Sequence, residues 1–352
     1  MAKVEQGDAS KGVLTCSDWA RSQQLSPIGT AGFYSGFLLV ETPMPWPADI
    51  AEIPELKDVA LVAAAANLRF QAVSRVGSDG GPGAATAATA ALDERHLVLY
   101  QRRWQPGGQA SVAQDKPQWA DKLERSETVA PASALASAAT ALIEAVAAPT
   151  AAPGLAVPPR ATAEPTRVVD LLICTHGRRD VCCGSKGTGL ASSIAVEPVA
   201  HPDAEVRTWR TSHTGGHRFA PTAIFLPDAT LWAFAERPLL QQVVAHSGDI
   251  GAALPFLRGS ACLGPPAQQA LEKAVLSEVG WELLAVRRQG SDLGDGRAQL
   301  YTDRFGTWVA TVREARRVPQ PDCRTDPANA TKFGPEWVVE DLQHRDDGAD
   351  DR

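Results

Sequence analysis

The chain has 352 residues, of which 44% are apolar, so it is long enough for about two or three domains with a substantial buried core. Its formal net charge of −7 excludes a general binder of nucleic acid or of anionic membranes, because such proteins need a basic surface. The N-terminus has no apolar segment typical of secretion, and the most apolar run (59–68) is far shorter than the roughly 20 residues that span a bilayer. We therefore expect a cytoplasmic protein that binds neither nucleic acid nor membrane.

Residues 1–145 are predicted to form an N-terminal α/β domain. Apolar and β-branched runs favour three strands, and helical spacing favours two helices. These elements are expected at 36–41 (strand), 54–68 (helix), 70–76 (strand), 96–102 (strand) and 133–146 (helix). Their order suggests a degenerate thioredoxin-like unit. The segment 77–91, rich in Gly, Ala and Thr, is expected to be a surface loop.

An Ala- and Pro-rich segment at 146–166 is predicted to be an extended linker, since proline fixes φ and removes a backbone donor. A thioredoxin-like domain is expected to follow at 167–264, because its elements run strand, helix, strand, hairpin, helix. They are expected at 167–174, 190–196, 206–212, 223–226 with 230–234, and 238–245. The first strand leads directly into a cysteine, which is where this fold places its redox chemistry.

A C-terminal α+β segment is expected at 265–340. It would begin with a helix from Pro266 and continue with strands near 281–287, 297–302 and 307–313. The last residues, 341–352, are predicted to be an acidic tail. The fold class expected for the whole chain is therefore α/β, with a thioredoxin-like domain between the two flanking parts.

Two short segments of the middle domain concentrate metal-binding side chains. One runs from Cys174 to Gly184 (CTHGRRDVCCG) and the other from His213 to Arg218 (HTGGHR). Thiolate and imidazole are ligands that suit iron–sulfur centres, zinc and copper. The two glycines between His213 and His217 each cost a helix about 1 kcal/mol relative to alanine, so we expect a loop there rather than a helix.

Four interpretations of these segments remain open on the residues alone. The plainest is a set of buried cysteines and surface histidines. A structural zinc site with two cysteines and two histidines fits the histidine spacing, but zinc sites commonly begin with two cysteines two to four residues apart. A thioredoxin-like dithiol needs Cys-x-x-Cys, and a Rieske-type centre needs Cys-x-x-His after its first Cys-x-His. The sequence contains neither of those two motifs.

The same residues resemble a known family. Cys174-Thr-His176, Arg179-Asp180, Cys183-Gly184 and His213-Thr-Gly-Gly-His217 are similar to the motifs of the sucrase/ferredoxin-like family of thioredoxin-like ferredoxins. The N-terminal stretch Cys16-Ser-Asp-Trp-Ala-Arg, Gly29-Thr-Ala and Trp46 also resemble this family, and the likeness extends over residues 14–315.

The resemblance implies a [2Fe–2S] cluster bound by two cysteines and two histidines. By position these ligands would be Cys174, Cys183, His213 and His217. Cys182 is the competing ligand, and Cys183 is preferred because it directly precedes Gly184, as in the family motif. His176 is expected to support the site by hydrogen bonding rather than to bind iron. The remaining cysteines, Cys16, Cys262 and Cys323, are expected to be buried or incidental thiols.

The implied function is electron transfer by a carrier with no substrate turnover of its own. Two ferric ions, two sulfides, two thiolates and two neutral imidazoles sum to zero charge, so this centre accepts an electron more easily than one with four thiolates. The alternatives are a zinc-stabilised interaction module and a thiol oxidoreductase that uses Cys182 or Cys183. Partners would be redox proteins, a reductase and an acceptor. A basic cluster would help an acidic partner dock; it comprises Arg178, Arg179, Lys186, Arg207, Arg210 and Arg218.

Overall fold

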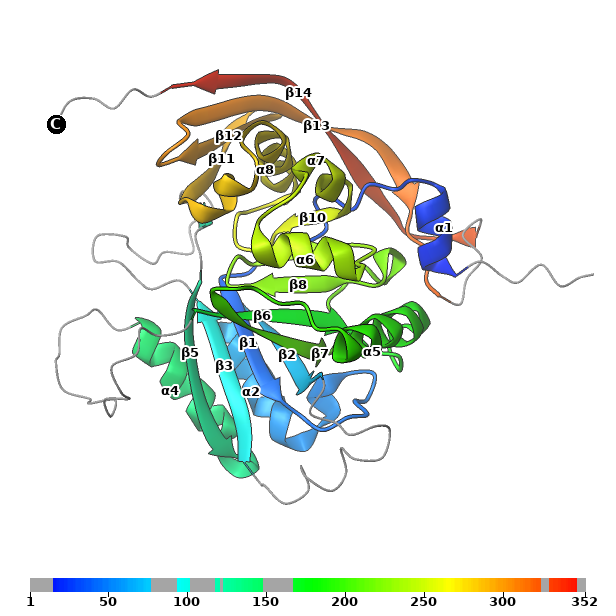
Figure 1. The fold of residues 1–352 in the computed structure, drawn as a ribbon, viewed down its shortest axis with the longest axis vertical. Coiled ribbons are helices and arrows are strands. Elements are labelled where there is room, and N and C mark those ends of the chain that lie inside the picture. The colour runs from blue at the N-terminus through cyan, green and yellow to red at the C-terminus, as the bar shows by residue number, and fades with distance from the viewer. Residues whose placement is uncertain are drawn as a thin grey trace, which may run out of the picture.

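The computed structural model describes residues 15–76, 94–101, 118–120, 123–147, 167–323 and 329–346. The protein is an α/β protein, as predicted. Among the described residues, nine strands form one mixed sheet in the order β10-β9-β8-β6-β7-β2-β1-β3-β5, and five strands form a second, antiparallel sheet in the order β14-β13-β12-β11-β4 (Figure 1).

The middle part of the chain has the strand order of a thioredoxin fold. Its elements are β6 (Arg167–Cys174), η3 (Cys183–Gly187), α5 (Thr188–Val196), β7 (Ala204–Thr211), η4 (His217–Phe219), β8 (Ala223–Leu226), β9 (Thr230–Trp232), α6 (Arg237–Ala245), α7 (Ile250–Ala253), η5 (Leu254–Phe256) and β10 (Leu257–Ser260). Strand β6 is parallel to β7 and antiparallel to β8, which pairs with β9. The predicted order of strand, helix, strand, hairpin and helix is therefore confirmed.

The N-terminal part repeats this arrangement. Its elements are α1 (Cys16–Ser22), β1 (Gly36–Glu41), η1 (Ile50–Glu52), α2 (Pro54–Ala65), β2 (Leu68–Arg75), β3 (Glu94–Gln101), β5 (Glu124–Pro131), η2 (Ala132–Ala134) and α4 (Leu135–Ala147). Strand β1 is parallel to β2 and antiparallel to β3, which pairs with β5. The suggested second thioredoxin-like unit is thus present. Strand β5 was not predicted.

The two units are joined through their edge strands, because β2 pairs antiparallel with β7. Helices α2 and α4 pack on the outer face of the first unit, and α5 and α6 pack on that of the second. The inner faces of both units share one apolar core, which includes Phe37, Leu39, Leu172 and Trp209. The predicted linker at 146–166 and the domain boundaries that depend on it stay predictions, since residues 148–166 lie outside the described residues. The loop expected at 77–91 lies outside them as well.

The C-terminal part packs α8 (Pro266–Val279) against the second sheet. This part contains η6 (Trp281–Ala285), β11 (Arg288–Gly294), β12 (Arg297–Thr302), β13 (Thr307–Pro319) and β14 (Phe333–Arg345), and β4 (Gln118–Ala120) adds the last strand. The strand predicted near 281–287 is wrong: a 3₁₀ helix lies there, because Leu283 and Leu284 are both buried and do not alternate as strand residues do. Strand β14 also includes 341–345, the first residues of the expected acidic tail.

Helix α1 is separated from the rest of the N-terminal unit. In Figure 1 it lies beside the end of the long β13–β14 hairpin. The N–H of Ser26, which follows α1, donates to Glu336 of β14 (2.8 Å). The first and last described parts of the chain therefore meet next to the middle unit. No helix among the residues described combines the length and the apolar composition needed to cross a bilayer.

A buried carboxylate connects the two thioredoxin-like units. Asp170 of β6 is fully buried, and it accepts hydrogen bonds from Tyr100 of β3, from Arg207 (2.6 and 2.7 Å) and from the indole N–H of Trp209 (2.7 Å). Since Tyr100 belongs to the first unit and Asp170 to the second, this network fixes their relative position.

We expect Asp170→Ala to lower the free energy of unfolding by about 3–5 kcal/mol, because it leaves the Arg207 guanidinium without its buried counter-charge. Denaturant unfolding measures this change. A matched control is Glu197→Ala, which removes an exposed ion pair with Arg237 and should cost less than about 1 kcal/mol. Equal losses in the two variants would contradict a special role for the buried carboxylate.

Candidate metal centre

The predicted ligands lie at the carboxyl edge of the parallel strands β6 and β7. Cys174 is the last residue of β6 and pairs with Thr211, the last residue of β7, and His213 follows two residues later. The turn after β6 brings Cys183 back to the same edge. The ligand atoms of Cys174, Cys183 and His213 all lie within 4.8 Å of one another, and both cysteines are fully buried. These three residues make up a group that can hold a metal ion.

Glycines allow the backbone segments around this group to approach closely. The Cα atoms of Gly177 and Gly184 lie so near each other that a Cβ at position 184 would overlap with Gly177. A Cβ at Gly187 would overlap with the carbonyl oxygen of Cys174. Larger residues would therefore push the π-helical turn η3, which begins at Cys183, away from β6.

The surroundings of Cys174 favour its thiolate form. Hydrogen bonds from the Cys183 thiol, the His213 ring and the backbone N–H groups of His176 and Thr214 hold the pKa of Cys174 well below its usual range, although burial opposes this. The Cys183 thiol is the donor in this pair, so its pKa is raised. A pair of thiols that already shares one negative charge is suited to binding a cation.

A single carboxylate contacts both predicted histidines. Asp180 Oδ2 lies 2.8 Å from His213 Nδ1, and Asp180 Oδ1 lies 3.7 Å from His217 Nδ1. Burial tends to raise the pKa of Asp180, but the hydrogen bond to His213 and the charges of both rings lower it overall. For His213, burial lowers the pKa, and the bonds to Asp180 and Cys174 outweigh it, so the pKa is raised. A carboxylate that holds the Nδ1 atoms leaves Nε2 of each ring for a metal.

His217 lies next to Cys174, Cys183 and His213, but it also contacts two other cysteines. Its Nδ1 is 3.3 Å from the Cys16 sulfur and 3.7 Å from the Cys323 sulfur. Its pKa is lowered by burial and by the charges of His213 and Arg218. Gly215 and Gly216 both have positive φ (77° and 67°), so the two histidines do not share one helix, as predicted: His213 lies in a loop and His217 begins η4.

His176 is buried and supports the loop that carries His213. Its Nδ1 accepts the backbone N–H of His213 (3.2 Å), and its Nε2 lies 2.7 Å from the carbonyl oxygen of Pro47. The Trp46 ring packs edge-on against it at 5.9 Å. His176 therefore connects the first unit to the site, and no metal-binding group of the described residues includes it.

Sequence analysis missed a second group of thiols. Cys16, Cys182 and Cys323 lie together, with their sulfurs 3.1–3.2 Å apart. Cys16 is buried, as expected, and Cys323 is half-buried, but neither thiol is isolated, because α1 and the end of β13 converge on this point. Only Cys262 is a separate buried thiol, in the shared inner core. The available signal was the pair Cys182-Cys183: neighbouring helical residues point about 100° apart, so the two thiols face different sites.

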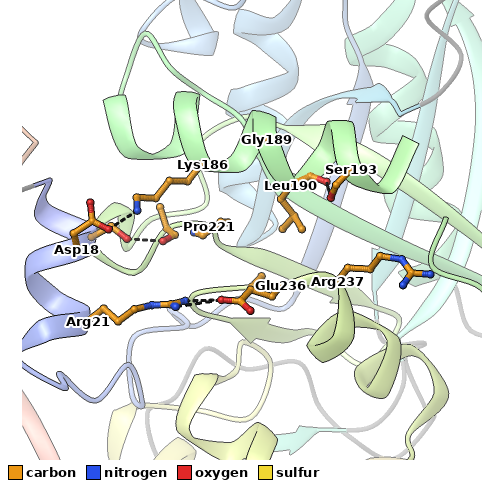
Figure 2. A pocket seen from close by; sticks show the side chains of 12 residues that line it. Asp18, Arg21, Lys186, Gly189, Leu190, Ser193, Pro221, Glu236 and Arg237 are labelled. Atoms are coloured by element: carbon orange, nitrogen blue, oxygen red, sulfur yellow. Dashed lines mark hydrogen bonds and ion pairs between the residues drawn. The ribbon is translucent and has the colours of Figure 1, made fainter. Parts of the chain in front are cut away.

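Polar side chains hold α1 in place beside these thiols. A cleft of about 470 Å³ separates α1 from α5 and α6 (Figure 2). Two ion pairs cross it, from Lys186 to Asp18 (2.5 Å) and from Arg21 to Glu236 (3.1 Å). Because Cys16 is the first residue of α1, these contacts also orient its sulfur.

The expected basic cluster is divided by the fold. Arg207 is bound to the buried Asp170, and Lys186 is paired with Asp18. Arg178 and Arg179 are exposed in the turn after β6, next to the exposed Val181. Arg178 and Arg179 therefore offer exposed basic side chains in the turn between Cys174 and Cys183.

The sequence matches the sucrase/ferredoxin-like family over residues 27–259, well over half of the chain. The chain belongs to the sucrase/ferredoxin-like family. The match contains Cys174, Cys183, His213 and His217, but it begins after Cys16 and ends before Cys262 and Cys323. Comparisons with curated proteins and with solved structures found no match.

We expect Gly187→Ala to lower the free energy of unfolding by about 1–3 kcal/mol, because the new methyl group overlaps with the Cys174 carbonyl. The control is Gly189→Ala in the same helical segment, where a Cβ meets no atom of the described residues within 4 Å. That change should be neutral or stabilise by up to about 1 kcal/mol. Thermal or denaturant unfolding distinguishes the two variants. If Gly187→Ala does not lower the free energy of unfolding, the close approach of Gly187 to the Cys174 carbonyl is contradicted.

Proposed function

We propose that this member of the sucrase/ferredoxin-like family is a one-electron carrier whose [2Fe–2S] cluster is bound by Cys174, Cys183, His213 and His217. The observation that carries the proposal is the convergence of two buried thiols and an imidazole at the carboxyl edge of β6 and β7. When bound, such a cluster accepts and returns a single electron.

The chain's own residues suit this centre in three ways. Cys174 and Cys183 supply thiolate charge in a buried place, which matches a cluster with two thiolate ligands. The glycine contacts bring the backbone close to these sulfurs. Asp180 holds Nδ1 of His213 and lies near Nδ1 of His217, so Nε2 of both rings remains for iron.

Electron exchange would take place with partner proteins at the turn after β6. Arg178, Arg179 and Val181 are exposed there, directly beside the cysteines. A basic and partly apolar surface suits an acidic redox partner, and a reductase and an acceptor would use it in turn. Six cysteines without a disulfide are consistent with the cytoplasm as the place of this exchange.

The first test is anaerobic purification followed by iron and sulfide analysis and EPR of the reduced protein. We expect two irons and two sulfides per chain, with loss of both in Cys183→Ala and in His213→Ala. Cys262→Ala and His344→Ala are matched controls outside the site and should keep the cluster. A protein without iron and sulfide, or one whose cluster survives both ligand substitutions, would contradict the proposal.

A second test is the pH dependence of the reduction potential. Reduction makes the centre more negative and favours protonation at the imidazole Nδ1 atoms, so the potential should fall as pH rises. The fall would be up to about 59 mV per pH unit for one proton per electron. In Asp180→Asn the carboxylate that raises the His213 pKa is lost, so the fall should begin at lower pH. A potential that stays constant into the alkaline range contradicts histidine ligation.

A further inference from the structure

Three thiols from distant parts of the chain meet at one point beside the candidate cluster site. Cys16 begins α1, Cys182 precedes η3, and Cys323 follows β13. Their sulfurs form a nearly equilateral triangle, with separations of 3.2 Å (16 to 182), 3.1 Å (16 to 323) and 3.2 Å (182 to 323). A disulfide would join only two of them and needs a separation of about 2.05 Å.

We propose that Cys16, Cys182 and Cys323 bind a second metal ion, a single Zn²⁺. Zinc binds thiolates with bonds of about 2.3 Å, which places tetrahedrally arranged sulfurs about 3.8 Å apart. The triangle therefore has to widen by about 0.6 Å on each side to admit the ion. Such a small triangle suits one ion, whereas a cluster of several irons holds its cysteines around a larger core.

A cationic side chain lies beside the triangle. Arg218 is half-buried, its charge interacts with Cys16, and its Nε has no hydrogen-bond partner among the residues that the structure describes. The backbone N–H of Ser17 donates to Cys182. Three thiolates and Zn²⁺ carry one net negative charge, which the neighbouring Arg218 offsets.

His217 connects this site to the first one. Its Nδ1 lies 3.3 Å from the Cys16 sulfur and 3.7 Å from the Cys323 sulfur, which leaves Nε2 for the proposed cluster. Zinc would then be held by the three sulfurs, and we expect its fourth ligand to come from solvent beside Cys323, the one thiol of the three that is not fully buried. The ion joins α1, η3 and the C-terminal hairpin.

Two of the three proposed zinc ligands lie outside the residues that match the family. Cys16 and Cys323 lie outside residues 27–259, whereas all four proposed cluster ligands lie within them. The zinc site does not require the cluster to be present, so each can be measured without the other.

The test is zinc, iron and sulfide analysis of the full-length protein produced with zinc in the medium and purified anaerobically. We expect one zinc per chain, and its loss in Cys323→Ala and in Cys16→Ala with iron and sulfide retained. In His213→Ala we expect the reverse, loss of iron with zinc retained. Cys262→Ala should keep both metals.

Replacement of zinc by Co²⁺ provides a readout on the folded wild-type protein. A thiolate-to-cobalt charge-transfer band that is lost on addition of excess zinc supports the site. Wild-type protein without zinc, zinc that remains at one per chain in both Cys16→Ala and Cys323→Ala, or a disulfide between two of the three cysteines in the intact protein would overturn it. If the wild-type protein contains zinc but no iron, and Cys323→Ala loses the zinc, the electron-carrier function is contradicted. The zinc site is supported in that case.

Discussion

The parallel pairing of β6 with β7 is the constraint on which the candidate centre depends. Their register places Cys174 opposite Thr211, so both strands end at the same level of the sheet. In a parallel pair, the segments that leave the carboxyl ends start side by side. Cys174 and His213 therefore meet although they are far apart in the sequence, and the turn after β6 has only to return Cys183 to the same edge. A register shift of one residue would turn the Cys174 side chain to the other face.

Buried polar groups then fix what the backbone brings together. Asp170 joins the two units through Tyr100, and His176 joins the same units through Pro47 and His213. Arg258 is a third case, since its buried guanidinium donates to the carbonyl oxygens of Thr30 and Gly215. All three connect the first unit, or the segment leading into it, to the site-bearing unit. The N-terminal unit thus contributes to the shape of the centre, although all four proposed ligands come from the site-bearing unit.

Much of the fold could be predicted from local sequence patterns. Buried strands such as β6 are continuous apolar runs, and helices such as α6 begin with proline in the first turn, so both are visible in the sequence. Strand β5 could not be found this way, because it is an edge strand with exposed Glu124 and Glu127 and little apolar alternation. The metal-binding residues around Cys174 and around His213 are close together within each motif, so the sequence also indicated metal chemistry. The group of Cys16, Cys182 and Cys323 could not be predicted, because its members are joined only by tertiary structure.

The separation of these thiols along the chain also determines when they can meet during folding. Cys16 and Cys182 are 166 residues apart, and Cys16 and Cys323 are 307 residues apart. Closing such long loops costs entropy that only contacts made late in folding can offset. During synthesis the third thiol emerges after both thioredoxin-like units, so the triangle can close only when the chain that forms both units has been made.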